Sequence, residues 1–175
     1  MHDAARSSER PHRSGRPFNH PVETGLRSLC VLYEAFPRRY DLQRLVFFDY
    51  LIVHSGDAPS GPDSLHPPTP FRSNEFLVRR RLVEDGIRLM LSRCLVDTVV
   101  DASGFHYAAS ESAASFIEAL TAPYTQSLRR RAAWIARAFG QMPDSELSDF
   151  FNRNLDRWGS EFEFIQEWDS EGSNG

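Results

Sequence analysis

Apolar residues recur at helical spacing in two segments that follow residue 20. In the first, Pro21 suits the start of a helix, because the missing N–H is not needed there, and Pro37 ends the pattern. In the second, residues 41–56, Asp41 is a suitable N-cap and Gly56 a suitable end. The apolar residues of the second helix are distributed around most of its circumference, so we expect this helix to lie at the centre of the core.

A third helix is predicted from Ser73 or Asn74 to about Cys94. Its predicted buried face consists of Phe76, Val83, Ile87, Met90 and Cys94. The pairs Arg81–Asp85 and Glu84–Arg88 are four residues apart, a spacing that supports a helix. Gly86 in its interior costs about 1 kcal/mol relative to alanine, which indicates a close packing contact at that position.

Beyond Cys94 the pattern changes to a period of two. Residues 95–100 and 105–110 are predicted to be β-strands, joined by a turn at residues 101–104 with a glycine that can adopt a positive φ. Three further helices are predicted at about 111–121, 124–140 and 144–158. The sequence therefore predicts a mainly α fold with a small β-hairpin, a winged-helix-like domain with additional C-terminal helices over residues 20–160.

The two ends of the chain differ from this body in charge. Residues 1–19 hold four arginines and two acidic residues without hydrophobic periodicity, so we expect a disordered basic arm. Residues 141–175 hold nine acidic residues and two arginines, and residues 161–175 read as an acidic aromatic tail. Such a tail could dock on a basic groove or pack against its own domain. With 41% hydrophobic residues among 175, the body can form one core.

Several classes of protein are disfavoured by what the chain lacks. No apolar run approaches the roughly 20 residues of a membrane span, since Asp49 interrupts the longest candidate. The N-terminus carries no apolar stretch typical of a secretory signal. Cys30 and Cys94 both fall in apolar helical patterns, so they are expected to be reduced, buried thiols. We therefore expect a cytoplasmic protein.

The segment between the second and third helices, residues 54–75, contains histidine, serine and aspartate together with five prolines. Catalysis is not expected, because His54 and Ser55 are neighbours and no G-x-S-x-G motif is present. The side chains of His54, Asp57, Asp63 and His66 could gather around a metal, but their spacing matches no established metal pattern. No phosphate-binding glycine motif is present either. We therefore expect neither an enzyme nor a cofactor.

DNA binding is the main alternative that these patterns leave open. Arg79, Arg81 and Arg88 could contact DNA from the third helix, which would be the recognition helix of a winged helix. The same helix also carries acidic residues, whereas affinity for phosphates requires several uncompensated cations. About 18 residues separate the second and third helices, whereas a helix-turn-helix reader joins them by about 3–4 residues.

The composition of the segment 54–75 agrees better with a docking surface for a protein partner than with DNA binding. Rigid prolines reduce the entropy lost on docking, and arginines can bind partner carboxylates in a bidentate manner. The predicted partner-binding residues are His54, Asp57, Leu65, His66, Phe71, Arg72, Arg79, Arg80 and Arg81, with Phe162, Phe164 and Trp168 in the tail.

Five stretches resemble a known family. They read HPVETGLRSLCVLYEAFP, DLQRLVFFDYLIVHSGD, SLHPPTPFRSNEFLVRRRLVEDGIRLMLSRCLV, SFIEALTAPY and RWGSEFEF, and together they cover roughly residues 20–168. The family is the middle component of bacterial ABC-three-component systems, best known from Lamassu-type anti-phage defence.

The resemblance implies a non-catalytic, winged-helix-like adaptor subunit in anti-phage or anti-plasmid defence. It would bridge an SMC/Rad50-like ATPase subunit to an effector, often a nuclease, and would meet DNA mainly through that complex. Neither a membrane nor a small-molecule substrate is expected. The alternative is a winged-helix DNA-binding regulator.

Overall fold

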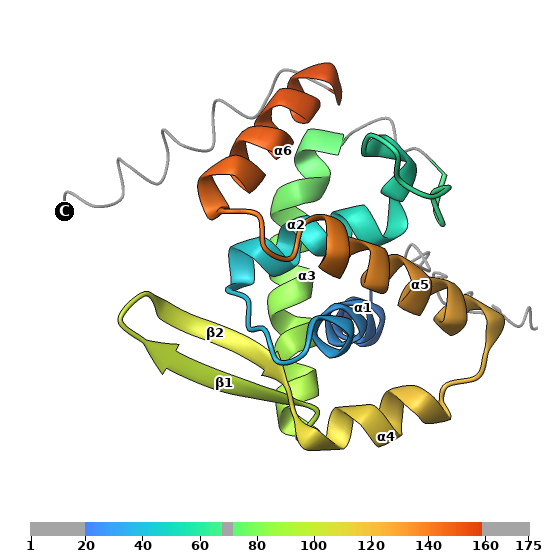
Figure 1. Ribbon diagram of the computed structural model, residues 1–175, viewed down its shortest axis with the longest axis vertical. Helices are drawn as coiled ribbons and strands as arrows, with labels where there is room; N and C mark the ends of the chain where they lie inside the picture. Colours follow the sequence, from blue (N-terminus) through green and yellow to red (C-terminus); the bar gives the residue numbers. More distant parts are fainter. Residues whose placement is uncertain (1–19, 68–71, 159–175) are drawn as a thin grey trace, which may run out of the picture.

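The computed structural model describes residues 20–67 and 72–158, with side chains for residues 20–67 and 77–154. The elements, in chain order, are α1 (Pro21–Ala35), α2 (Leu42–Val53), the 3-10 turn η1 (Ser55–Asp57), α3 (Arg72–Ser92), β1 (Val96–Asp101), β2 (Gly104–Ala109), α4 (Glu111–Ala119), α5 (Pro123–Ala138) and α6 (Asp144–Trp158) (Figure 1). The predicted fold class, mainly helical with one antiparallel hairpin, is confirmed. The predicted arm, residues 1–19, and tail, residues 161–175, lie outside the described residues.

Both predicted helix starts near the N-terminus are confirmed by their capping contacts. Pro21 is the first residue of α1, and the Nδ1 atom of His20 accepts a hydrogen bond from the amide of Val22 at 3.3 Å. Asp41 caps α2 by accepting the amide of Arg44 at 2.7 Å. Every residue from 44 to 53 is buried, as expected for a central helix. No helix in the described parts of the chain combines the length and apolarity that a membrane crossing needs.

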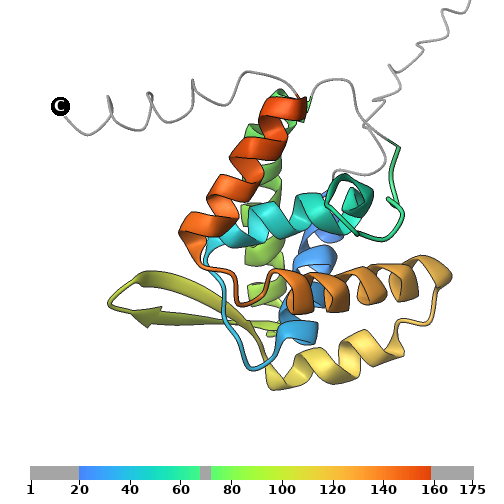
Figure 2. The ribbon, with the colours of Figure 1, turned by 45° about the horizontal axis from the view of Figure 1, so that its top comes forward.

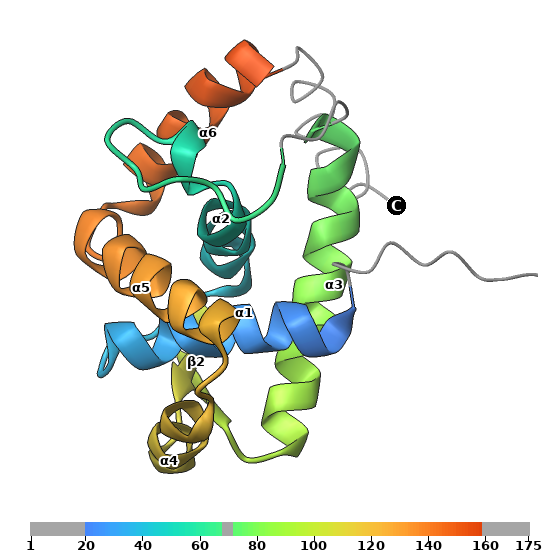
Figure 3. The ribbon, with the colours of Figure 1, turned by 90° about the vertical axis from the view of Figure 1, so that its right-hand side faces the viewer.

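Helices α1 and α3 cross at a pair of glycines (Figure 3). A Cβ atom on Gly86 would lie 2.5 Å from the amide nitrogen of Gly25, closer than real contacts allow. Beside this crossing, the hydroxyl of Thr24 donates a hydrogen bond to the carbonyl of Leu82 at 2.8 Å. The close contact that Gly86 predicted is therefore present, and α1 is the helix on the other side of it.

The hairpin lies beside the helices and projects away from them (Figure 1). Strands β1 and β2 pair in antiparallel register, with Asp101 opposite Gly104, whose φ is 120°. Tyr40, in the connection between α1 and α2, forms a bridge to Tyr107 of β2 through two backbone hydrogen bonds of 3.0 and 2.8 Å. This bridge fixes the α1–α2 connection against the base of the hairpin.

The three C-terminal helices share the core of the first three. Helix α5 packs against α1 and α2, and α6 contacts α3. The rings of Phe47 in α2 and Phe151 in α6 stack with centroids 4.1 Å apart. The start of α6 lies beside the start of α2 (Figure 2). One cluster of buried apolar side chains extends from Leu29 to Phe151.

The two cysteines have different environments. Burial raises the pKa of the Cys30 thiol to about 12, so this thiol stays protonated. Cys94 is exposed, and the expectation of a buried thiol was wrong for this residue. It follows the end of α3 with a φ of 56°, and the amide of Leu95 donates to the carbonyl of Met90 at 3.0 Å, as in a Schellman C-cap. The helical pattern therefore ended two residues earlier than predicted.

Candidate functional site

A buried ionic cluster lies where α1, α2 and α3 meet. The carboxylate of Asp49 accepts hydrogen bonds from Nε of Arg27 and from Nη1 of Arg79, both at 2.6 Å. Nη1 of Arg79 also donates to the backbone carbonyl of Asp49 at 3.0 Å. Burial alone would raise the pKa of Asp49, but the two guanidinium groups outweigh it and hold the pKa below its usual range.

The position of Arg79 corrects the prediction that it contacts a partner or DNA. Its side chain is 5% exposed, and its guanidinium also lies over the ring of Tyr50, 5.5 Å from the centroid. Within the triplet 79–81, helical geometry turns one residue into the core and leaves the others outside. Asp49 was the signal in the sequence, because a charge inside an apolar helix requires a buried partner.

The segment after α2 folds back onto the domain. The carbonyl of Val53 accepts hydrogen bonds from the amides of Leu65 and His66 at 2.9 and 3.1 Å. Tyr50 donates its hydroxyl hydrogen to Asp57 at 2.5 Å. Leu65 and His66 are half-buried, so residues 54–67 pack against the domain and do not project from it.

Two predicted partner residues in this segment, His54 and His66, contact tyrosine side chains of the domain. His54 is 2% exposed, with its ring 4.8 Å from that of Tyr50, so a direct role in partner binding does not fit its burial. His66 lies 3.1 Å from the hydroxyl of Tyr124. Burial, assisted by Arg27, lowers the pKa of His66 to about 4, so its imidazole is neutral near pH 7.

The serine next to His54 is held by a hydrogen bond within this segment. Ser55 is fully buried, and its hydroxyl donates to the carbonyl of Asp63 at 3.1 Å. Within residues 20–67 and 72–158, no three His, Cys, Asp or Glu side chains are grouped so that they could hold a metal ion.

The exposed part of the predicted surface lies on the first half of α3. The side chains of Leu77 and Val78 are 53% and 58% exposed although they are adjacent and apolar. Arg80 and Arg81 are exposed beside them, and Arg80 donates to the amide oxygen of Gln43 at 2.8 Å. We call Leu77, Val78, Arg80 and Arg81 the α3 patch. It combines apolar anchors with two cations.

The remaining predicted contacts are of two kinds. Arg88 is exposed, but its charge is balanced by Glu84 at 2.6 Å and Asp85 at 3.5 Å. Asp85 therefore pairs with Arg88, not with Arg81 as the spacing suggested. Arg72 begins α3, but its side chain is not described. The other predicted contacts lie outside the described residues, namely Phe71, Phe162, Phe164 and Trp168.

The tip of the hairpin exposes a second apolar pair. Val100 and Phe105 face each other across the strands and are 63% and 66% exposed. The hairpin, residues 96–109, contains Asp97 and Asp101 but no arginine. Arg39, in the α1–α2 connection, lies 3.0 Å from Asp101. The hairpin itself therefore presents apolar and acidic groups.

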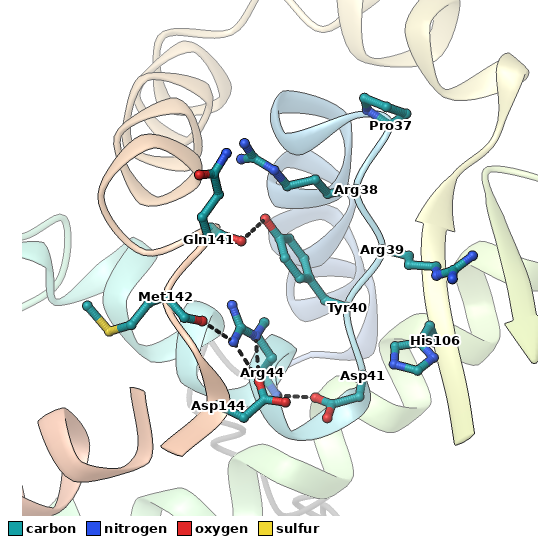
Figure 4. A pocket seen from close by; sticks show the side chains of 11 residues that line it. Pro37, Arg38, Arg39, Tyr40, Asp41, Arg44, His106, Gln141, Met142 and Asp144 are labelled. Atoms are coloured by element: carbon teal, nitrogen blue, oxygen red, sulfur yellow. Dashed lines mark hydrogen bonds and ion pairs between the residues drawn. The ribbon is translucent and has the colours of Figure 1, made fainter. Parts of the chain in front are cut away.

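A cavity of about 470 Å³ lies between the α1–α2 connection and the α5–α6 turn (Figure 4). Arg44 crosses it and donates to Asp144 at 2.5 Å and to the carbonyl of Phe139 at 3.3 Å. Arg38 donates to the carbonyl of Ala136 at 3.3 Å, and Tyr40 to that of Gly140, also at 3.3 Å. These bonds hold the end of α5, the α5–α6 turn and the start of α6 against α2 and the α1–α2 connection, so the polar groups here have a structural role.

Residues 17–161 match the family described as "ABC-three component (ABC-3C) system Middle Component 2". No curated protein and no solved structure matches the chain.

Proposed function

The chain belongs to the middle component 2 family of ABC-three component systems, and on that premise we propose that it is a non-catalytic adaptor subunit in anti-phage or anti-plasmid defence. In this proposal the subunit joins an SMC/Rad50-like ATPase to a nuclease effector and helps to control it. It acts in the cytoplasm and needs no cofactor. Membership of a multi-component system implies protein partners, and the identities of these partners are our inference.

The observation that carries the proposal is the α3 patch. Leu77 and Val78 are each more than half exposed, side by side on a helix whose opposite face is buried through Val83 and Ile87. Arginine is enriched at protein interfaces, and exposed apolar side chains beside it form a surface that a partner can bury. Arg81 forms no ion pair among the described residues, so its guanidinium is available for a carboxylate of a partner.

The buried ionic cluster fixes the orientation of the α3 patch. Arg79 lies between the patch residues in sequence and is held by Asp49 at 2.6 Å. Because Asp49 belongs to α2, the first half of α3 is fixed in rotation against the core, with Leu77, Val78 and Arg81 outward. A rigid surface of this kind loses little entropy when a partner binds.

DNA binding by a winged helix is the second candidate. The order of three helices and a hairpin, with Tyr40 bridged to Tyr107, supports a winged-helix-like arrangement. The charges disfavour direct contact with DNA, because the hairpin carries two aspartates and no arginine. Of the three predicted DNA-contacting arginines, Arg79 is buried and Arg88 is balanced by two carboxylates. We therefore propose that this subunit is brought to DNA by the other proteins of the complex and does not bind DNA directly.

The experiment that separates these candidates is purification of the tagged full-length chain expressed together with its neighbouring genes. The adaptor proposal expects the ATPase and the effector to co-elute with it in constant proportion on gel filtration. It also expects the isolated subunit to leave duplex DNA unshifted at low salt. An isolated subunit that binds duplex DNA, and that elutes without the other two proteins, would support the regulator instead.

A further inference from the structure

A groove of about 600 Å³ lies between the segment after α2 and one face of α5. One wall is formed by residues 60–63, and the other by side chains at positions 127, 130, 131, 134 and 137. These positions recur every three or four residues, so they lie along one face of α5. The opposite face of α5 is buried through Leu128, Ala132 and Ile135. We call this feature the arginine groove.

The arginine groove has an excess of positive charge. Three guanidinium groups line it, those of Arg130, Arg131 and Arg137, against the carboxylate of Asp63. Arg131 is engaged, since it donates to the carbonyl of Asp63 at 3.1 Å through Nε and at 2.6 Å through Nη2. Arg130 and Arg137 are exposed, and neither forms an ion pair among the described residues. Partial burial, together with the charge of Arg130, lowers the pKa of Arg131.

An aromatic side chain lies among these cations. Trp134 lines the arginine groove and is half-buried, with its ring 5.5 Å from that of Phe139 in an edge-to-face contact. A groove that offers guanidinium groups and the side of an indole suits an acidic peptide with aromatic residues.

We propose that the acidic aromatic segment of this chain, residues 161–175, occupies the arginine groove. The segment carries five carboxylates and no basic residue, together with the aromatic residues Phe162, Phe164 and Trp168. Its charge and its aromatic content are both complementary to the groove. The acidic segment is part of the same chain, and this raises its effective concentration to the millimolar range.

The length of the chain permits this contact. Ten Cα–Cα steps lead from the end of α6, at Trp158, to Trp168. A chain extends about 3.3–3.6 Å per residue, so this stretch can span roughly 35 Å. That is more than the roughly 22 Å length expected for the 15-residue α6 helix, along which the segment can run back towards Arg137 near the end of α5.

Paramagnetic relaxation in the full-length chain tests this placement. In a Cys94→Ser background, a spin label on Gln166→Cys reacts selectively, since the buried Cys30 thiol stays protonated. We expect loss of the Trp134 indole and Arg137 amide signals at about 50 mM salt and their recovery at about 500 mM, where charges are screened within a few ångströms. Undiminished signals at both salt concentrations would overturn the proposal.

Two charge variants make the test specific. Replacing Glu161, Glu163 and Glu167 with glutamine removes three carboxylates of the segment and should restore both signals. A matched control replaces three exposed carboxylates elsewhere, Asp97→Asn, Glu111→Gln and Glu146→Gln, and should leave the broadening unchanged. Broadening that persists in the first variant contradicts a charge-based contact. If a single-stranded oligonucleotide shifts Arg137 while the segment remains unbound, the groove belongs to nucleic acid and the proposal fails.

Discussion

The carboxylate of Asp49 and the guanidinium of Arg79 lie 2.6 Å apart inside the core, and they join the middle of α2 to the first half of α3. Arg27 of α1 binds the other carboxylate oxygen at the same distance. Three helices thus share one buried anion. The contact also divides the run of three arginines on α3, since Arg79 is held inside while Arg80 and Arg81 reach the surface.

Removing the buried carboxylate should be strongly destabilising. Asp49→Asn leaves two buried guanidinium groups without a counter-charge, and loss of one partner of a buried ion pair costs about 3–5 kcal/mol. The control is Asp101→Asn, whose exposed pair with Arg39 should contribute about 0–1 kcal/mol. Urea denaturation followed by circular dichroism measures both, and equal losses for the two variants would refute a stabilising role for the cluster.

Stability should fall as the pH decreases from about 6.5 to about 4. The folded-state pKa of His66, about 4, lies below the value of roughly 6.5 in an unfolded chain. Between these pH values the unfolded state binds more protons, so acidification favours it. The lowered pKa of Asp49 adds a second loss at lower pH, below its ordinary value. The melting temperature of His66→Gln should decline less steeply over the first window, and an identical slope would contradict the assignment.

Gly86→Ala should destabilise the protein although alanine favours helices. The new Cβ would lie 2.5 Å from the backbone nitrogen of Gly25, where no flexible side chain can give way. Overpacking of this kind costs about 1–3 kcal/mol, whereas the gain in helix propensity is about 1 kcal/mol. Thermal melting measures the net effect, with the exposed Ser115→Ala as control. An unchanged or higher melting temperature for Gly86→Ala would show that the two helices can separate at little cost.

Cys94→Gly should stabilise the chain. Cys94, two residues after the end of α3, has a φ of 56°, a conformation that glycine adopts without the steric strain of a side chain. Because the side chain is exposed, little packing is lost, and a gain of about 0.5–1 kcal/mol is expected. Cys94→Ala keeps the Cβ atom and serves as the matched variant. A glycine variant no more stable than the alanine variant would contradict this explanation.

Local signals predicted most of the fold. Pro21 and Asp41 marked helix starts because their effects depend on neighbouring residues alone, and Gly86 marked the helix crossing because a mid-helix glycine needs a packing reason. The same reasoning misplaced Cys94, because a helical hydrophobic pattern does not contain the αL residue that ends α3.

The candidate site was less predictable, because it depends on which helices meet. Arg79 lies three residues after Phe76 and four before Val83, so helical spacing places it on the predicted buried face, unlike Arg80 and Arg81. The partner that holds its charge is not local, because Asp49 lies 30 residues earlier in the chain. His54 likewise sits in a polar, proline-rich stretch, and only the return of residues 65 and 66 to the carbonyl of Val53 shows that the stretch packs on the domain.

The most direct test of the account is the recovery of the ATPase subunit with a tagged Leu77→Asp, Arg81→Glu variant. Both side chains are exposed in the α3 patch, so the variant should fold, which circular dichroism checks. The control, Phe116→Asp with Arg93→Glu, alters an exposed apolar residue of α4 and an exposed arginine directly after the end of α3. We predict that recovery drops by at least about tenfold for the patch variant, the effect of losing an interface hot spot, and is unchanged for the control. Equal recovery of the ATPase with both folded variants would contradict the assignment of the α3 patch as the partner surface.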